Sequence, residues 1–354
     1  MRILHIIDSL NTGGAEFLVA NVVNSMKEHE HRIVVLVEGN DYQDLLEGIR
    51  IDCLNYSSKL GLPSAKRQLK RIIKEHKTDL IHSHLLTATF VARQARPATI
   101  PLLFSVHNIL SKSAFEASQL SYYLEKYSYK EDHHALFVSD EARKDYDNVI
   151  GIKGAYSVLP NFVSDEFFDP EWERNDHSLN DPVSLVAVGS LKEQKNYSFL
   201  IKSLRTFNPN IELHIIGKGP LKEKLEEQIR QSGMEDRVKL LGGISEVYRV
   251  LKNYDLFIMA SRYEGFGIAL TEAMAAGLPT LISNAPTLVS LSDGASSEFE
   301  LGNESDFREK LQELIDNQNL RESSSQKGKK RAKEICGKTN YLQKLEEIYK
   351  SLCL

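Results

Sequence analysis

Residues 261–279 read SRYEGFGIALTEAMAAGLP, and this segment carries more structural information than any other part of the chain. The apolar run at 256–260 that precedes it predicts a buried strand. A helix is expected over 268–276, because Gly277 and Pro279 are typical stop signals just beyond a helix end. The segment therefore predicts a strand, a glycine-containing loop and a helix whose N-terminus lies where parallel α/β sheets bind ligands.

The same alternation of apolar runs and amphipathic stretches extends over most of the chain. Around the segment, strands are expected at 184–188, 212–216, 238–241 and 280–282, and helices at 196–206, 220–232 and 245–253. In the first half, strands are expected at 3–7, 32–37, 80–82 and 102–106, and helices at 15–29, 64–77 and 117–130. Strands that alternate with helices of this length predict doubly wound, mainly parallel α/β sheets.

The length of the chain predicts more than one domain. A single hydrophobic core stops growing at roughly 250–300 residues, and this chain has 354. Residues 161–182 are acidic and turn-rich, with Pro170 and Pro182. We therefore expect an N-terminal domain at 1–162, a linker at 163–182, a C-terminal domain at 183–335 and a C-terminal helix at 336–354, within a stretch that is helical throughout from 306.

Composition excludes several classes of protein. The net charge of −5 argues against a nucleic-acid binder, and no apolar run approaches the roughly 20 residues that span a bilayer. The three cysteines, which are not in paired spacing, argue for a reducing compartment and against a disulfide framework or a zinc site. We expect a cytoplasmic protein without a bound metal.

Two carboxylates flank the predicted helix N-terminus. Glu264 lies in the loop and Glu272 lies about one turn into the helix. Each carboxylate can accept two hydroxyl groups, which suits a sugar or a ribose. Gly265 and Gly267 would let a ligand approach the backbone closely. The alternative is that both glutamates are simply solvated.

Further motifs occur in a fixed order along the chain. They are Gly13-Gly14-Ala15-Glu16, His82-Ser83-His84, His107, Pro160-Asn161-Phe162-Val163, the runs VGSLKEQKN at 188–196 and LHIIGKGP at 213–220, and Leu240-Leu241-Gly242. With the Glu264-x7-Glu272 spacing, they resemble the family 4 retaining glycosyltransferases over nearly the whole chain. The resemblance implies the GT-B fold, in which two Rossmann-like, doubly wound domains face a cleft and C-terminal helices cross back to the first domain.

The resemblance also implies a donor site for a nucleotide-sugar, with UDP as the expected nucleotide and without a metal or cofactor. Lys195 would neutralise the diphosphate, Glu264 would hold the donor sugar and Glu272 the ribose. The remaining donor-binding positions would be Ser190 and the backbone of Gly13, Gly14, Phe266, Gly267 and Ile268. Ser190 departs from the family, in which many members have arginine at this position, so one cation is missing.

On the acceptor side, His107 is expected to enter the cleft and to act in catalysis with Glu264 and Lys195. Weaker acceptor-side candidates are His84, Asn108 and Tyr122. The expected acceptor is a saccharide or a lipid-linked saccharide, in surface polysaccharide or glycoconjugate synthesis.

Residues 64–77 hold six cations and one carboxylate, with a narrow apolar stripe. A basic amphipathic helix can lie on an anionic membrane, which suggests peripheral contact at the inner face of the membrane. An ordinary solvated helix is the alternative.

Three other functions are weighed against glycosyl transfer. A nucleotide-sugar epimerase would share the fold, and Ser190 keeps open a silent scaffold that binds nucleotide. A nicotinamide oxidoreductase is disfavoured, because Lys222 stands where the third glycine of a Gly-x-Gly-x-x-Gly fingerprint would follow Gly217 and Gly219.

Overall fold

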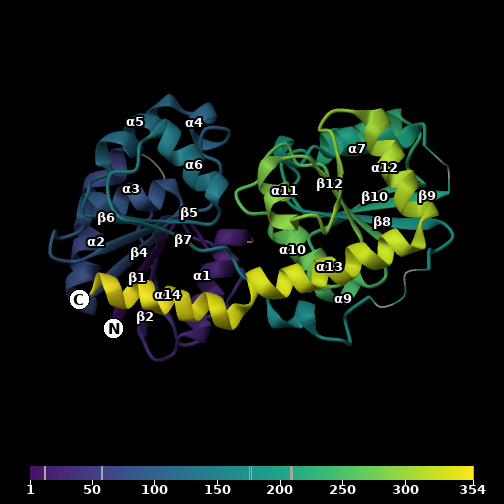
Figure 1. Ribbon diagram of the computed structural model, residues 1–354. Helices are drawn as coiled ribbons and strands as arrows, with labels where there is room; N and C mark the ends of the chain where they lie inside the picture. Colours follow the sequence, from purple (N-terminus) through teal and green to yellow (C-terminus); the bar gives the residue numbers. More distant parts are fainter. Residues whose placement is uncertain (12, 57–58, 175, 177, 208–209, 354) are drawn as a thin grey trace. The chain divides into compact units, whose positions relative to one another are not determined.

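The computed structural model describes the chain except residues 12, 57–58, 175, 177, 208–209 and 354. It divides into two compact units. Unit 1 comprises Met1–Asn161 and Thr339–Leu354, and unit 2 comprises Phe162–Lys338. In each unit a parallel sheet is covered by helices (Figure 1). The expected architecture of two doubly wound α/β domains is confirmed.

Unit 1 is built on a seven-stranded sheet with the order β3-β2-β1-β4-β5-β6-β7, and every neighbouring pair is parallel. The order reverses between β1 and β4, so the segments that follow these two strands leave the sheet side by side. The strands are β1 (Arg2–Ile7), β2 (Glu30–Val35), β3 (Arg50–Cys53), β4 (Leu80–His84), β5 (Leu102–Val106), β6 (His133–Phe137) and β7 (Tyr156–Val158).

Helices bury the apolar side chains of this sheet on both faces. On one face, Leu4, Ile6 and Ile81 pack with α2 and α3. On the other face, Ile7 and Ile33 pack with α1. The helices of unit 1 are α1 (Gly14–Ser25), α2 (Leu62–His76), α3 (Leu86–Ala95), α4 (Ala114–Ala117), α5 (Gln119–Ser128), α6 (Asp140–Val149) and α14 (Lys338–Leu352).

Unit 2 is built on a six-stranded parallel sheet with the order β10-β9-β8-β11-β12-β13. Here the order reverses between β8 and β11. The strands are β8 (Val183–Val188), β9 (Ile211–Ile216), β10 (Val238–Gly242), β11 (Leu256–Met259), β12 (Thr280–Ser283) and β13 (Ser297–Phe299). The helices are α7 (Tyr197–Arg205), α8 (Lys222–Gln231), α9 (Tyr248–Leu251), α10 (Ile268–Ala275), α11 (Pro286–Ser292), α12 (Glu304–Asp316) and α13 (Gln318–Cys336).

Two glycines let the loops after β8 and β9 pack directly on each other. A Cβ atom on Gly217 would lie 1.9 Å from the carbonyl oxygen of Gly189, and Gly217 has a φ of 156°. The Leu191 amide donates to the Lys218 carbonyl oxygen over 2.9 Å. These contacts place the loop that follows β8, which contains Ser190 and Lys195.

The segment 163–182, interpreted as a linker, forms part of unit 2. The Arg174 Nη2 atom donates to Asp255 Oδ1 over 2.9 Å, and both side chains are buried. The other carboxylate oxygen of Asp255 accepts from the Ser184 amide at 2.6 Å and hydroxyl at 2.8 Å. A buried ion pair of this kind ties the segment to the sheet, and the sequence pattern of the segment does not reveal it. Residues 175 and 177 lie outside the described part of the chain.

The C-terminal stretch is interrupted, although one continuous helical region was expected from residue 306. Helix α12 ends before Asn317, whose side-chain oxygen accepts from the Leu320 amide at 3.1 Å and caps α13. A second interruption at Gly337, which has a φ of −66° and a ψ of 124°, separates α13 from α14. Asparagine is a favoured N-cap residue, so the first interruption has a local cause.

Helix α2 buries its apolar stripe. Ala65, Leu69, Ile72 and Ile73 all belong to the core of unit 1. The helix therefore presents its cations to solvent, and these apolar side chains are not available to a membrane. Within the described residues, no helix is long and apolar enough to cross a bilayer.

We predict that Asp255→Asn lowers the free energy of unfolding of unit 2 by about 3 kcal/mol, because Arg174 then remains buried without its counter-charge. Trp172 is the single tryptophan and lies in unit 2, so its fluorescence during urea unfolding reports this change. The control is Glu226→Gln, which removes the exposed ion pair with Lys222 and is expected to cost less than about 1 kcal/mol. Equal shifts in the two variants would contradict the prediction.

Candidate functional site

The candidate donor site is formed by the two loops that follow β8 and β11. These strands are neighbours at the reversal of strand order in unit 2, which is where open α/β sheets bind ligands. The loops are joined by a backbone hydrogen bond from the Arg262 amide to the Gln194 carbonyl oxygen at 2.8 Å. The strand order thus brings together two segments that are far apart in sequence.

At the centre of the site Lys195 forms an ion pair with Glu264. The Lys195 Nζ and Glu264 Oε1 atoms are 2.6 Å apart, and the two side chains are only 14% and 7% exposed. The Gln194 side-chain amide donates to the other carboxylate oxygen at 3.3 Å and to the Tyr263 carbonyl oxygen at 2.9 Å. The Glu264 carboxylate is therefore held at both oxygens, beside a cation that is suited to a phosphate.

Contacts from further along the chain fix the loop that carries Glu264. The Thr287 hydroxyl, on α11, donates to the Glu264 carbonyl oxygen at 2.7 Å. The Ser283 hydroxyl, at the end of β12, donates to the Ser261 carbonyl oxygen at 2.6 Å. The sequence analysis did not select these residues, because a hydroxyl near a helix start has no distinctive spacing.

Tyr197 supports the opposite loop. Its hydroxyl donates to the Gly189 carbonyl oxygen at 3.0 Å. Burial raises the pKa of Tyr197, and the nearby charge of Glu264 raises it further. The phenol therefore stays protonated and remains a hydrogen-bond donor to the loop.

Helix α10 begins directly beside the ion pair. Gly267 precedes it with a φ of 103°, a conformation that favours glycine, and a Cβ atom there would lie 3.0 Å from a methyl carbon of Leu288. The first amides of an α-helix have no intrahelical partner, so those at Ile268 and the next residue are available to an anion. Phe266 is buried beneath this turn.

Glu272 lies on α10 and is half-buried. Desolvation of its carboxyl group raises the pKa to about 8, and the charge of Lys195 opposes the shift. At pH 7 the carboxyl group is therefore mostly protonated, and it can both donate and accept a hydrogen bond.

Ser190 lies half-buried in the loop after β8, and its carbonyl oxygen accepts from the Lys192 amide at 2.8 Å. A serine brings no charge to this position. Lys195 thus supplies the cation that the loop places against Glu264.

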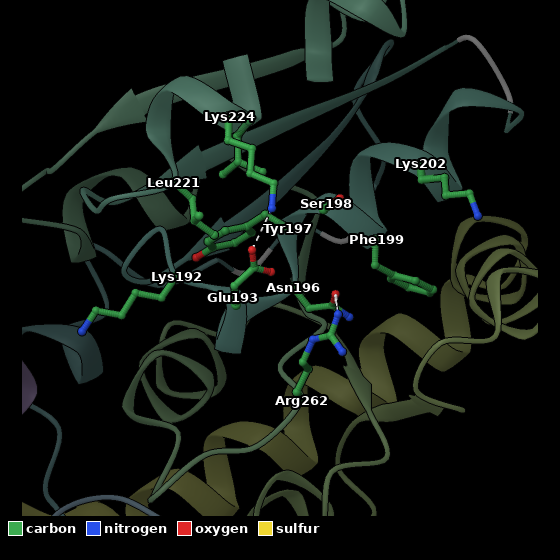
Figure 2. Close-up of a pocket in the computed structure, with 11 residues that line it drawn as sticks. Lys192, Glu193, Asn196, Tyr197, Ser198, Phe199, Lys202, Leu221, Lys224 and Arg262 are labelled. Carbon is green, nitrogen blue, oxygen red and sulfur yellow. Dashed lines mark hydrogen bonds and ion pairs between the residues drawn. The ribbon is translucent and has the colours of Figure 1, made fainter. Parts of the chain in front are cut away.

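A separate pocket of about 220 Å³ lies next to this loop. Figure 2 shows Glu193 directed toward Lys224 and Arg262 directed toward Asn196. The residues that line the pocket are Lys192, Glu193, Asn196, Tyr197, Ser198, Phe199, Lys202, Leu221, Lys224, Leu225 and Arg262. Lys195, Glu264 and Glu272 are not among the lining residues, so this pocket is distinct from the candidate donor site.

In unit 1, Gly13 and Gly14 follow β1 and begin α1. The Tyr42 hydroxyl donates to the Gly13 carbonyl oxygen at 3.1 Å, and its oxygen lies 3.3 Å from the Gly13 amide nitrogen. A Cβ atom on Gly14 would meet nothing within 4 Å. Packing therefore does not require glycine at position 14.

The structure brings two of the acceptor-side candidates together. His84 Nδ1 lies 3.4 Å from His107 Nε2. Burial lowers the pKa of His107 to about 4, and it lowers that of His84 well below the usual value. Both rings are therefore neutral at pH 7.

Asn108 is exposed next to His107. Tyr122 lies on α5, where its hydroxyl accepts from Lys126 Nζ at 2.8 Å and its ring packs edge-on against Phe115. Among the described contacts, none joins Tyr122 to either histidine.

Among the described residues of unit 1, two groups of side chains have the composition of a metal site, namely His5, His82 and His84, and Glu28, His29 and Glu346. His82, however, already has both ring nitrogens engaged, with the Tyr349 hydroxyl at 2.7 Å and the Ser105 hydroxyl at 2.8 Å. Neither group includes a donor-site residue of unit 2.

Two Rossmann-like units with parallel sheets define the GT-B fold, which solved structures such as that of Anabaena Alr3699/HepE share. The model for glycosyl transferases group 1 matches residues 169–331, and the model for Glycosyltransferase Family 4 matches residues 12–167. The chain belongs to glycosyltransferase family 4.

Individual relatives share low sequence identity with this chain, but the matches cover most of its length. The chain is 28% identical over 306 residues to the putative glycosyltransferase EpsF of Bacillus subtilis, covering 81% of this chain and 80% of EpsF. It is 27% identical over 290 residues to a Campylobacter jejuni alpha-1,4-N-acetyl-D-galactosaminyltransferase named for a PP-undecaprenol-linked saccharide, covering 77% of each chain. The crystal structure of Anabaena Alr3699/HepE in complex with UDP-glucose matches with a TM-score of 0.85 and 19% identity, covering 99% of this chain and all of that one.

We predict that Glu272→Gln stabilises unit 2 at pH 8 but has little effect at pH 5. The folded-state pKa of about 8 lies above the reference value of 4.5, so the folded protein retains a proton that the unfolded chain releases. The free energy of unfolding of the wild type must then fall as the pH rises from about 5 to about 8. The glutamine variant has no carboxyl group at this position and therefore lacks this decrease. Partial exposure limits the expected difference to about 2 kcal/mol at pH 8.

Urea unfolding followed by Trp172 fluorescence at both pH values measures this difference. Glu226→Gln is the control, because its exposed carboxyl group should give the same small effect at both pH values. A stability difference for Glu272→Gln that does not change with pH would refute the raised pKa.

Proposed function

We propose that this protein is a retaining hexosyltransferase that moves a sugar from a UDP-sugar to a saccharide, free or lipid-linked, without a metal ion. The observation that carries the proposal is the Lys195–Glu264 ion pair at the N-terminus of α10. It combines a cation and helix amides for a diphosphate with a carboxylate for sugar hydroxyls. The relatives support the donor and acceptor classes, since HepE is complexed with UDP-glucose and the C. jejuni enzyme is named for a lipid-linked saccharide.

In this proposal, donor binding rearranges the ion pair. The diphosphate takes Lys195 as its counter-ion, which releases one oxygen of Glu264 to accept hydroxyl groups of the sugar. Gln194 keeps its contact with the other oxygen, so the carboxylate stays oriented. Since Ser190 supplies no second cation, the negative charge that develops on the leaving diphosphate is stabilised by Lys195 and by the free amides of α10.

Glu272 is assigned to the ribose of the donor. Its carboxyl group is mostly protonated at pH 7 because of the pKa of about 8. Two ribose hydroxyls favour a carboxylate acceptor, so nucleotide binding is expected to lower this pKa and to release a proton near pH 7.

The reaction is proposed to proceed on one face of the sugar ring. The acceptor hydroxyl oxygen bonds to the anomeric carbon as the bond from that carbon to the β-phosphate oxygen breaks. The acceptor proton passes to the departing diphosphate, and UDP leaves. Configuration at the anomeric carbon is thereby retained, and Glu264 serves as a binding group rather than as a nucleophile.

The proposed place of action is the cytoplasmic side of a membrane, with α2 as the contact. Arg67, Lys70, Arg71 and Lys74 on this helix are exposed, whereas its apolar stripe is buried. The contact is therefore electrostatic, between cations and anionic lipid headgroups.

We predict that UDP stabilises the wild-type protein more than GDP or ADP does, in buffer with EDTA, and that Lys195→Ala weakens UDP binding about 30-fold. The loss follows from removing the cation that faces the diphosphate, since a charge-assisted contact is worth about 2 kcal/mol. Calorimetric titration with UDP measures the dissociation constant. Lys202→Ala, which removes a cation on the neighbouring helix α7 that pairs with Glu304, should leave it within about twofold.

The same titration tests the donor site, and incubation with a UDP-sugar in the absence of an acceptor tests the epimerase alternative. Failure of folded wild-type protein to bind any nucleoside diphosphate would overturn the donor site. A UDP-sugar converted to its epimer without an acceptor would replace the transferase with an epimerase.

We predict that the protein binds vesicles containing anionic phospholipid at low salt and is released at about 0.5 M salt, because the Debye length falls. Reversing two cations of α2, in Arg67→Glu/Lys70→Glu, should weaken binding about tenfold or more, at about 1 kcal/mol for each cation. Co-sedimentation measures this effect. Lys330→Glu/Lys333→Glu, on exposed positions of α13, is the matched control. Equal loss in both double variants would mean that only net charge matters.

A further inference from the structure

A groove of about 500 Å³ lies in unit 1 between the C-terminal end of α2 and the turn that follows α3. Its α2 side consists of Lys70, Lys74 and Lys77 around the buried Ile73. The opposite side includes Pro97, which is exposed, and Ile100, which is half-buried. The volume lies within the range of small-molecule sites, about 300–1,000 Å³.

The charge of the groove is positive and uncompensated. Within the described part of the chain, none of the three lysines forms an ion pair, and no carboxylate lines the groove. Glu75, on the same helix, is already engaged by Arg32 and Arg71. The fourth cation of the lining, Arg96, is paired with Asp132. Three ammonium groups are therefore left without a counter-ion beside one cavity.

The three lysines form one row, because positions separated by four and then three residues lie on the same face of a helix. Arg67 and Arg71 lie in a neighbouring row on α2 and do not line the groove. The exposed cations of α2 are therefore not equivalent, since one row borders a cavity and the other faces open solvent.

Lys77 has a backbone conformation that does not favour lysine. It follows the last residue of α2 with a φ of 50° and a ψ of 47°, and glycine is the usual residue at such a helix end. Its amide donates to the carbonyl oxygens of Ile73 and Lys74, and a glycine would make the same bonds. The end of the helix therefore does not require this side chain.

The groove lies at the end of the sheet where β4 and β5 begin. Lining residue Thr78 comes just before β4, and Ile100 comes just before β5. His84 ends β4, and His107 follows the other end of β5. A five-residue strand is about 16 Å long, so the groove is separate from these acceptor-side candidates.

We propose that this groove binds an anionic phospholipid of the membrane surface. The phosphate group lies among the ammonium groups of Lys70, Lys74 and Lys77, and the first methylene groups of a chain contact Pro97 and Ile100. The inference rests on the proposed membrane contact of α2 and deepens it, because it replaces a diffuse attraction with one defined lipid site.

The apolar side of the groove favours a lipid over a free anion. Lysine side chains lay their methylene stems along apolar surface and keep the ammonium group at the water boundary. A free phosphate would use the ammonium groups and leave Pro97 and Ile100 without a role. The apolar stripe of α2 stays in the core, so the apolar contact comes from the turn after α3 and from the lysine stems.

The first experiment compares two double variants of the full chain, each of which removes two cations from α2. Co-sedimentation with vesicles of phosphatidylglycerol and phosphatidylcholine measures the affinity. Lys70→Gln/Lys74→Gln should weaken binding about tenfold or more, whereas Arg67→Gln/Arg71→Gln should weaken it about threefold or less, since a lysine near the surface is worth about 1 kcal/mol. Equal losses would overturn the groove and leave only a diffuse contact through α2.

The second experiment locates the lipid by nuclear magnetic resonance of isoleucine δ1-methyl groups. The Ile100 signal is assigned by its loss in Ile100→Val. Monomeric dihexanoyl-phosphatidylglycerol should shift the Ile100 signal and leave that of Ile33, in the core on the other face of the sheet, unchanged. Inorganic phosphate at the same concentration should have little effect. An equal shift with phosphate would replace the lipid site with a free-anion site, and no shift with either would overturn the proposal.

Lys77→Gly separates lipid binding from folding. This variant should keep or raise the melting temperature, because glycine suits the φ of 50°, and it should weaken vesicle binding. Unchanged vesicle binding would overturn the role of Lys77. If the wild type does not bind vesicles but the short-chain lipid shifts Ile100, the lipid site stands and the proposed membrane location fails. Binding of UDP to unit 2 tests the proposed transferase independently of these outcomes.

Discussion

The ion pair between Lys195 and Glu264 is the interaction on which the candidate site depends. Its partners come from loops after β8 and β11, and these loops meet because the strand order of unit 2 reverses between the two strands. Close packing of Gly189 against Gly217 places one loop, and the Thr287 hydroxyl fixes the other. An ion pair with a 2.6 Å separation and little solvent exposure requires both loops to be held firmly, since a small displacement would leave two poorly solvated charges apart.

The two units use different electrostatics. Unit 2 places the full charges of Lys195 and Glu264 in the loops of its candidate donor site. Unit 1 places neutral imidazoles beneath His107, because burial lowers the pKa values of His5, His82 and His84 so far that none carries charge at pH 7. In the proposed reaction, the cation of unit 2 would bind the anionic donor, whereas the imidazoles of unit 1 would carry no charge.

Local patterns predicted the regular part of the fold well. Strands such as β1, β5, β8 and β11 are short apolar runs, and Gly277 marks the end of α10. The sequence analysis missed β6, which begins with two histidines, and β13, which has three residues. The segment 163–182 looked like a linker because its composition is polar. Its attachment to unit 2 depends on Arg174 and Asp255, which are 81 residues apart, and such a pairing leaves no mark on composition.

The sequence by itself determined the two doubly wound domains, the glycine-bounded start of α10 and the identity of the lysine and glutamates around it. These features follow from steric and solvation effects that act over a few neighbouring residues. Only the tertiary structure decided that Lys195 pairs with Glu264 across 69 positions and that Tyr349 supports His82 across 267. Such contacts depend on which strands are neighbours and which side chains share a buried face. Burial also sets the protonation of Glu272 and the histidines, and no spacing of residues in the sequence encodes the local dielectric environment.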